Sequence, residues 1–269
     1  MEEKMSLKKI FGLLPERSIK HKIRCIYYNN FKDIDFQLSY KKGHYTVTFK
    51  DGIVIKFYNN PCGILTEIVK EYFLKYKLKK GDIVIDAGAW FGPFAIYAAS
   101  QIGPTGKVIV FEPDPLNYID LKNNILLNNL NNIVAINKGL WNTKSTLRFF
   151  SIGKYSGGSH ILFDDSLKEN KGYVEISVVS LDEELKLQGI SQVDFIKMDI
   201  EGAEIEAIEG SKNILQNRNT NLAIATYHIR NGEMTCKKVE HLLKSYGYYV
   251  ESLNPHHLTT YATPIDSRN

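Results

Sequence analysis

The sequence predicts an α/β fold whose seven-stranded sheet is mostly parallel with one antiparallel edge strand. Two observations carry this prediction. Apolar runs of strand length alternate with helical patterns throughout residues 61–269, which is typical of a parallel sheet covered by helices. Residues 81–113 contain one complete unit of this kind: a strand, a glycine-rich turn, a helix and a second strand that ends in a carboxylate. We therefore expect residues 61–269 to form one large domain, preceded by an accessory region in residues 1–60.

The composition is that of an ordinary folded protein. Hydrophobic residues make up 43% of the chain and charged residues 24%. The net charge of +4 is mild and does not demand a nucleic-acid partner. Cys25, Cys62 and Cys236 lie far apart, so they predict neither a disulfide framework nor a zinc site and fit a reducing compartment. Because no apolar run has the length of a membrane span and no leader pattern is present, we expect a cytoplasmic protein.

The accessory region has two patterned stretches. Residues 5–14 mix apolar side chains with lysines and stop at a proline, which predicts a short amphipathic helix. This helix would either pack on its own domain or make a weak contact with a membrane surface or a partner. Alternating runs at residues 45–49 and 53–57 flank an Asp-Gly pair, which is a strong signal for a β-hairpin.

A helix expected over residues 64–77 leads into the central unit. The first strand of this unit ends at Asp86, and Gly88 follows in the turn. A glycine there can take a positive φ and lets a ligand approach the backbone, while the unpaired N–H groups at the start of the next helix can face a polar group. Glu112 ends the second strand, where nucleotide-binding crossovers place a carboxylate on the ribose hydroxyls. The unit therefore predicts a nucleoside site.

The spacing of the glycines distinguishes between two nucleoside ligands. Dinucleotide-binding folds use G-x-G-x-x-G, whereas this turn reads Asp86-x-Gly88-x-x-x-Gly92. An acid ahead of the first glycine suits an ammonium group and repels a pyrophosphate. S-adenosylmethionine carries an amino acid and a sulfonium but no phosphate. The residue types therefore favour S-adenosylmethionine over NAD.

The rest of the chain continues the alternation. A helix is expected after Glu112 to about residue 127, and the strand that follows ends at Asn137. Residues 155–172 form a long polar connection, which is either a functional loop or a surface excursion. The other expected elements are strands at residues 133–136, 147–150, 174–179, 193–199, 222–226, 248–252 and 258–262 and a helix at 235–246.

Candidate catalytic groups follow two of these strands. Asp199 ends the strand at 193–199, Glu201 comes just after it, and His228 stands beyond the strand at 222–226. Since ligands of open α/β sheets lie outside the carboxyl ends of the strands, we expect these groups at the site. Glu201 and Glu204 could instead favour a helix N-terminus, and a lone histidine is often structural. Asp199 or His228 is the candidate general base, and the carboxylates could also hold a divalent cation.

Three blocks of the sequence resemble the FkbM-type methyltransferases, in the same order and at similar spacing. They are DAGAWFGPFAIYAA, VIVFEPDPLNYIDLKNNILLNNL and VDFIKMDIEGAEIEAIEG. The resemblance covers roughly residues 62–262 and is most specific in the third block. The chain differs at Trp90, where the family often has asparagine.

The resemblance implies a Rossmann-like methyltransferase fold with S-adenosylmethionine as donor, and mostly O-methylation of sugars or other hydroxyl-bearing compounds. By this match Glu112 would hold the ribose and Asn137 would lie near the adenine. Asp199 and Glu201 would stand beside the transferring methyl and the acceptor. Asp86, Gly88 and Gly92 would line the methionine end of the donor, and Ala89 and Pro113 are further candidates for binding the cofactor.

The sequence thus predicts an S-adenosylmethionine-dependent O-methyltransferase that acts on a saccharide, a glycan or a similar small molecule. One alternative is an RNA methyltransferase. Archaeal tRNA guanine methyltransferases carry Asn-Pro-Pro-aromatic where this chain has Met198-Asp199-Ile200-Glu201, which disfavours methylation of a base. The other alternative is a binding module that keeps the nucleoside pocket without chemistry, and only turnover separates it from an enzyme.

Overall fold

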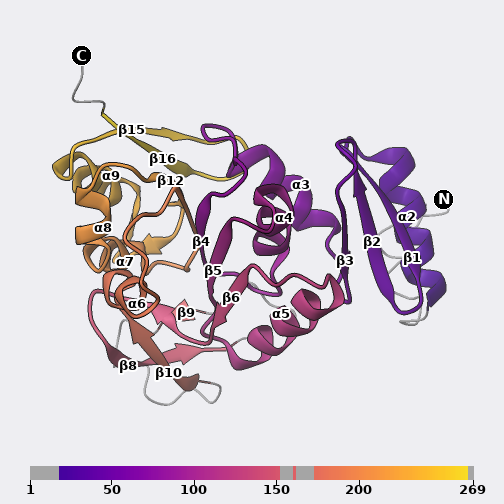
Figure 1. Cartoon of the computed structure of the whole chain (residues 1–269), viewed down its shortest axis with the longest axis horizontal. Coiled ribbons are helices and arrows are strands. Elements are labelled where there is room, and N and C mark those ends of the chain that lie inside the picture. Colours follow the sequence, from indigo (N-terminus) through magenta and orange to yellow (C-terminus); the bar gives the residue numbers. More distant parts are fainter. Residues whose placement is uncertain (1–17, 152–159, 162–172, 266–269) are drawn as a thin grey trace, which may run out of the picture.

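The computed structural model describes residues 18–151, 160–161 and 173–265 (Figure 1). A seven-stranded sheet forms its centre, as the sequence predicts. Its strands are, in spatial order, β15 (Tyr248–Leu253), β16 (Thr259–Pro264), β12 (Asn221–Ala225), β11 (Phe195–Met198), β4 (Ile83–Ala87), β5 (Lys107–Phe111) and β6 (Ile133–Ile136).

One strand of this sheet runs against the others. β4, β5, β6, β11 and β12 are parallel, whereas β16 is antiparallel to both of its neighbours. It lies one position in from the edge, between β12 and β15, because β15 turns back directly into β16. The carboxyl ends of the parallel strands therefore open on one side of the sheet.

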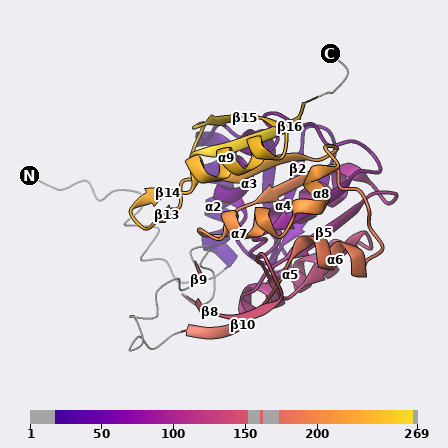
Figure 2. The ribbon, with the colours of Figure 1, turned by 90° about the vertical axis from the view of Figure 1, so that its left-hand side faces the viewer.

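Helices cover both faces of the sheet, so that alternate residues of each strand enter different cores (Figure 1). In β4, Val84 joins the core beneath one layer of helices, and Ile85 joins the core beneath the other. Figure 2 shows α7 and α9 across the second face. The first layer is α3 (Cys62–Glu71), α4 (Pro93–Ile102) and α5 (Pro115–Leu127); the second is α6 (Leu181–Leu187), α7 (Glu204–Glu209), α8 (Lys212–Gln216) and α9 (Cys236–Ser245).

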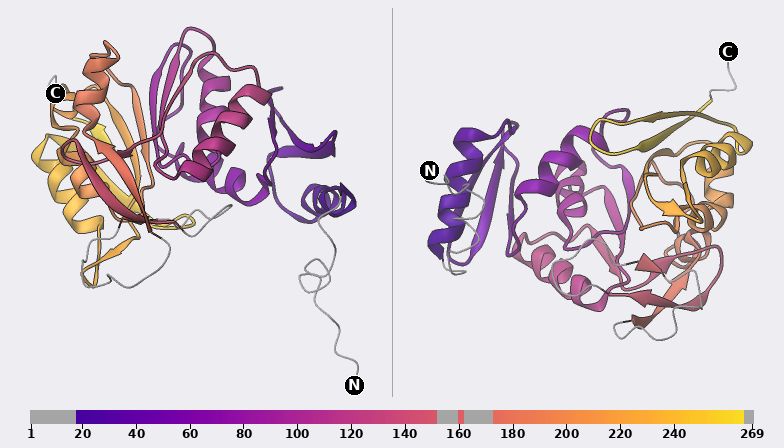
Figure 3. Two further views of the ribbon diagram at one scale, coloured as in Figure 1. Left: turned by 90° about the horizontal axis from the view of Figure 1, so that it is seen from below. Right: turned by 180° about the vertical axis from the view of Figure 1, so that it is seen from behind.

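The accessory unit, which we define as α2 (Ser18–Phe31) with strands β1 (Phe36–Lys41), β2 (His44–Phe49) and β3 (Val54–Phe57), lies at the end of the molecule opposite α9 and β15 (Figure 3). The predicted hairpin is confirmed as β2 and β3, with Thr48 paired to Val54. The sequence did not predict α2 or β1. The amphipathic helix expected at residues 5–14 lies outside the described residues.

Asn124 of α5 and Asn128, the C-cap residue of this helix, bind the free edge of β3 and the residue after it. Asn128 accepts from the backbone N–H of Lys56 at 2.7 Å and donates to its carbonyl at 2.7 Å. Asn124, one turn earlier, accepts from the N–H of Tyr58 at 2.9 Å. The accessory unit and the first face of the central sheet share one hydrophobic core.

The helix expected over residues 64–77 is shorter than predicted and ends at Glu71. Beyond it, apolar spacing continues but the backbone turns, because the aromatic rings that follow pack beneath the sheet instead of along a helix. Tyr76 stacks on Phe195 of β11 with ring centroids 5.1 Å apart, and Phe73 stacks on Phe94 at 5.3 Å.

A second sheet, of four strands, lies beside the carboxyl ends of the parallel strands of the first sheet. We call this side of the first sheet its carboxyl edge. Its strands are β7 (Gly139–Leu140), β10 (Tyr173–Val179), β8 (Ser145–Phe150) and β9 (His160–Ile161). The two strands expected near residues 147 and 174 are confirmed here as β8 and β10. Most of the polar connection at 155–172 lies outside the described residues.

A short hairpin follows β12 and consists of two strands of two residues each, β13 (Ile229–Arg230) and β14 (Glu233–Met234). No helix in the described part of the chain is long and apolar enough to cross a membrane.

Candidate active site

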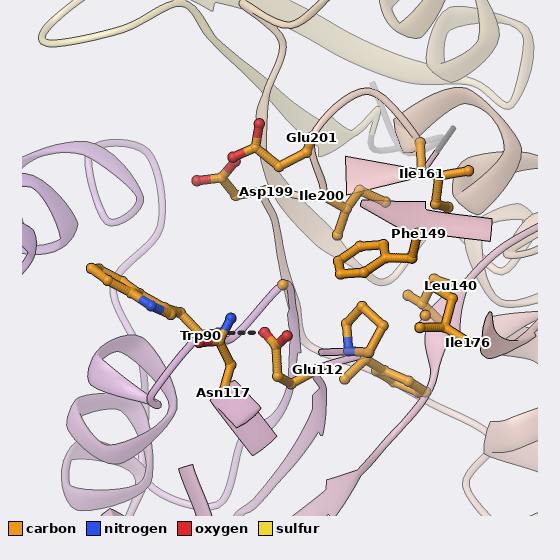
Figure 4. A pocket seen from close by; sticks show the side chains of 15 residues that line it. Trp90, Glu112, Asn117, Leu140, Phe149, Ile161, Ile176, Asp199, Ile200 and Glu201 are labelled. Carbon is orange, nitrogen blue, oxygen red and sulfur yellow. Dashed lines mark hydrogen bonds between the residues drawn. The ribbon is translucent and has the colours of Figure 1, made fainter. Parts of the chain in front are cut away.

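The first cavity at the carboxyl edge has a volume of about 580 Å³. It has one polar wall and one apolar wall (Figure 4). Glu112 and Asn117 belong to the polar side, and Leu140, Phe149 and Ile176 crowd the side formed by the four-stranded sheet. A cavity with this division suits a ligand that carries both hydroxyl groups and a flat apolar ring.

Glu112 is held rigidly at the floor of this cavity. Its Oε2 accepts from the backbone N–H of Trp90 at 2.6 Å (dashed in Figure 4), and its Oε1 accepts from the N–H of Asp114 at 2.9 Å. Burial raises the pKa of Glu112 to about 8, although these two N–H groups act in the opposite direction. Each carboxylate oxygen keeps lone pairs for further donors, so Glu112 can still accept from a ligand hydroxyl.

Gly88 brings two strand ends together. Its φ is 78°, and a Cβ there would overlap the carbonyl oxygen of Asp199. Only glycine therefore allows the turn after β4 to lie against the end of β11. The next residue but one, Trp90, has a left-handed φ of 55°, which directs its N–H to Glu112.

A second cavity of about 790 Å³ lies beyond this turn. Its walls are largely aromatic, with Tyr72, Phe94 and Tyr227 among them, and Lys197 and His257 add polar groups. The two cavities share four lining residues, which are Gly88, Trp90, Asp199 and Glu201. We call this shared wall the window. The two cavities are therefore adjacent at these four residues.

The acidic side of the window carries the predicted catalytic residues. His228 Nε2 lies 3.4 Å from Asp199 Oδ1 and 3.5 Å from Glu201 Oε2. His228 Nδ1 lies 2.9 Å from Oε1 of the fully buried Glu204. Topology thus brings together Asp199, Glu201 and His228, as the sequence predicts, and adds Glu204, which the sequence left as a helix-terminal charge.

The charges of this cluster depend on its burial. Burial raises the pKa of Glu201 to about 7, and the neighbouring imidazole of His228 lowers it only in part. Burial alone would lower the pKa of His228, but the Glu204 carboxylate, helped by Asp199 and Glu201, raises it to about 9. The described residues contain one group of three side chains arranged as metal ligands, Asp199, Glu201 and His228, whose ligand atoms all lie within 4.8 Å of one another.

Asp86 differs from the expectation that it lines the donor site. It is fully buried and lines neither cavity, because Lys197 on the adjacent strand pairs with it at 3.0 Å. Lys197 also donates to the carbonyl of Gly88 at 2.6 Å. The ion pair therefore stabilises the backbone of the glycine turn from its buried side.

Of the other residues predicted to bind the cofactor, some line a cavity and the others support the backbone around it. Pro113 lines the first cavity and Ala89 the second. Asn137 is exposed and lines neither; its amide donates to the carbonyls of Glu112 and Pro113 at 2.8 and 3.2 Å and so fixes their backbone. Gly92 begins α4 with a φ of 90° and also lies outside both linings.

Sequence reasoning missed several groups of the second cavity. Tyr72 donates from its hydroxyl to Asp199 Oδ2 at 3.0 Å, and its position in an apolar pattern gave no sign of this. His257 lines the cavity with Nδ1 3.2 Å from the fully buried Glu71. The two residues are 186 positions apart, so no local pattern connects them.

The strand order, the glycine turn and Glu112 at the end of the second strand define the Rossmann-like methyltransferases as a class. The family model for the methyltransferase FkbM domain matches residues 86–250. The chain belongs to this family of S-adenosylmethionine-dependent methyltransferases.

Curated relatives and a solved structure agree with this assignment. Methyltransferase sdnD of Sordaria araneosa is 29% identical over 53% of this chain and 67% of its own length. Methyltransferase 1 of Beauveria bassiana is 23% identical over 48% of this chain and 58% of its own length. The crystal structure of methyltransferase FkbM from Methylobacillus flagellatus KT superposes with a TM-score of 0.53 at 20% identity, over 72% of this chain and 47% of that one. The chain thus spans only about half the length of that structure.

Proposed function

We propose that this protein transfers the methyl group of S-adenosylmethionine to a hydroxyl of a saccharide, a glycan or a similar small molecule. One observation carries the proposal: the two cavities meet at the window formed by Gly88, Trp90, Asp199 and Glu201. Methyl transfer requires the donor sulfur and the acceptor oxygen to lie next to each other, and two adjacent cavities would hold them so.

The residues of the first cavity fit the donor. When bound, S-adenosylmethionine supplies an electrophilic methyl group on a sulfonium. Glu112 would accept the ribose hydroxyls, and Leu140 and Phe149 would enclose the adenine. Gly88 has no side chain to exclude the sulfonium from the window, and the carboxylate of Asp199 beside it favours a positive charge.

The residues of the second cavity fit a hydroxyl-bearing acceptor. Trp90 and Tyr227 offer partly exposed rings on which a sugar can rest, while His257 and Asp199 offer hydrogen-bonding groups. The hydroxyl must lose its proton, and Asp199 is the candidate for the group that takes it. His228, whose pKa is raised to about 9, holds a proton near neutral pH and would orient Asp199. The chain's task is then to position both reactants and to remove one proton.

Calorimetric titration with S-adenosylhomocysteine tests the donor site. We expect the wild-type protein to bind it and Glu112→Gln to weaken binding by about tenfold or more, because an amide NH₂ group replaces one of the two oxygens that accept hydrogen bonds. Glu175→Gln, which changes an exposed glutamate of β10, should bind like the wild type. A preference for NAD, or equal affinity in Glu112→Gln, would refute the proposal.

Transfer of labelled methyl tests the acceptor class. We expect label to appear in hydroxyl-bearing saccharides. Label found in RNA at low salt, and lost as salt rises, would favour the RNA alternative instead. Binding of S-adenosylhomocysteine without transfer to saccharide or RNA acceptors would leave the non-catalytic module as the better description.

A further inference from the structure

The two ring nitrogens of His228 lie at different distances from the carboxylates around them. Nδ1 has one close carboxylate, and Nε2 has two that are farther away. Nδ1 lies 2.9 Å from Glu204, within the usual range of a charge-assisted contact, which is about 2.7 to 2.9 Å. Nε2 lies 3.4 and 3.5 Å from two carboxylate oxygens, beyond that range. Within the described residues, Asp199 Oδ1 and both ring nitrogens of His228 are buried and make no hydrogen bond of good geometry.

These longer separations match the edges of a metal coordination shell. Ligand atoms about 2.1 Å from a shared ion, at angles between 90° and 120°, lie about 3.0 to 3.6 Å apart. The two distances from His228 Nε2, to Asp199 Oδ1 and to Glu201 Oε2, fall in this range. All three ligand atoms lie within 4.8 Å of one another. The imidazole is nine-tenths buried, with 7% of its side chain exposed, and its unpartnered nitrogen points at the two carboxylates.

Two of the three ligands are oriented by neighbours in the manner of known metal sites. Glu204 holds the far nitrogen of His228, as the carboxylate does in carboxylate–histidine–metal triads. The hydroxyl of Tyr72 donates a hydrogen bond to Asp199 Oδ2 at 3.0 Å. The other carboxylate oxygen, Oδ1, is the one that lies near the histidine. Both contacts fix a ligand atom in place before any ion arrives.

Charge also favours a cation here. Three carboxylates, those of Asp199, Glu201 and Glu204, surround one imidazole. The buried ammonium of Lys197 is already paired with Asp86. The guanidinium of Arg230 pairs with Glu206 at 2.6 Å.

We propose that Asp199, Glu201 and His228 bind one divalent cation of the Mn²⁺ type at the window. One imidazole with two carboxylates suits such an ion better than Mg²⁺, which prefers oxygen alone. Three protein ligands leave coordination positions for an acceptor hydroxyl, whose pKa a bound cation lowers. This assignment rests on the proposed function for its purpose, although not for the binding itself.

Manganese alone is the first probe. The full chain, freed of metal with EDTA and dialysed, is titrated with MnCl₂ by calorimetry and by electron paramagnetic resonance. We expect one ion per chain, and pulsed resonance should detect the nitrogen of a coordinated imidazole. His228→Gln should abolish the nitrogen signal and weaken binding at least tenfold.

Two further variants protect the test against misfolding. Glu201→Gln changes the ligand that is 27% exposed, so it disturbs packing least, and it too should weaken Mn²⁺ at least tenfold. Glu206→Gln removes a carboxylate from the same helix that carries Glu204 but outside the cluster, and it should bind Mn²⁺ like the wild type. Circular dichroism verifies the fold of each variant.

The outcomes separate this inference from the proposed function. If the wild type binds S-adenosylhomocysteine but no Mn²⁺, or binds Mn²⁺ equally in all three variants, the cation site is refuted and the donor site stands. If it binds Mn²⁺ with a nitrogen ligand but no S-adenosylhomocysteine, the cation site stands and the methyltransferase proposal fails.

Discussion

Glu112 shows how much one buried carboxylate can tie the ligand site to the stability of the fold. It is 4% exposed, and both of its oxygens accept backbone N–H groups from the two loops that form the first cavity. Burial nevertheless raises its pKa from 4.5 to about 8, so the folded protein binds a proton there more tightly than the unfolded chain does. Ligand recognition and acid–base behaviour therefore meet in one side chain.

This difference predicts a pH dependence of stability. The contribution of protonated Glu112 is fully present below about pH 4.5 and is lost as the pH rises through about 8. The slope approaches about 1.4 kcal/mol of unfolding free energy per pH unit at most. Urea unfolding between pH 5 and 8 measures it. Glu112→Gln should remove this component and Glu175→Gln should keep it; an unchanged slope in Glu112→Gln would contradict the prediction.

The residues that the sequence identified are those that follow strand ends. Asp199 and His228 belong to this group, because parallel topology alone brings such positions together. The residues that it missed act through partners far away in the chain. Tyr72 reaches Asp199 over 127 positions, and Lys197 reaches Ala87 over 110. Composition and spacing contain no signal for such pairs, so only the fold can reveal them.

Strands β4 and β11 are joined by charge as well as by backbone hydrogen bonds. Asp86 and Lys197 are direct partners in the parallel register, and their side chains pair at 3.0 Å with exposures of 0% and 6%. A buried charge left without its partner is costly, whereas removal of both charges costs little. The ion pair therefore fixes which strand ends can lie together at the window.

This pairing predicts the behaviour of three variants. Lys197→Met should lower the unfolding free energy by about 3 to 5 kcal/mol, because it strands the Asp86 carboxylate. Adding Asp86→Asn to it should restore much of the loss. Lys50→Met, which breaks the exposed pair with Asp35, should leave the urea midpoint unchanged. A double variant no more stable than Lys197→Met alone would show that the two charges are not coupled.

Helices and strands were predicted well where their pattern is local. The hairpin around Asp51 and Gly52 is an example, since turn chemistry and alternation agree there. The helix expected to reach residue 77 ends at Glu71 because its apolar spacing continues into rings that stack on Phe94 and Phe195. Apolar spacing reports burial, and burial against a sheet does not require a helix.

Helix α5 connects the accessory unit to the central sheet. Asn124 is fully buried and bonds Tyr58, Asn59 and the carbonyl of Phe91, which begins the turn before α4. The same asparagine thus contacts the two residues that follow β3 of the accessory unit and the loop that contains Trp90. The unit therefore supports the site from the far side of the first helix layer.

Replacement of this asparagine should loosen the accessory unit first. Asn124→Ala leaves the N–H of Tyr58 and the carbonyl of Phe91 unpaired, and we expect a loss of about 2 to 4 kcal/mol. Hydrogen exchange should accelerate at β3 more than at β4 and β5. Asn142→Ala, which removes a surface bond to Glu209, should leave all three strands unchanged. Uniform acceleration throughout the sheet would mean that the unit does not open separately.

The contacts of Glu71 have a consequence for the order in which the molecule is made. Its side chain accepts from Thr259 across 188 positions, and its carbonyl accepts from the hydroxyl of Tyr261 across 190. The first cavity needs nothing beyond Ala203, whereas the second also needs Tyr227 and His257. The ribosome therefore synthesises every residue that lines the first cavity before those that complete the second. The contacts of Glu71 form only when β16 enters between two strands already synthesised.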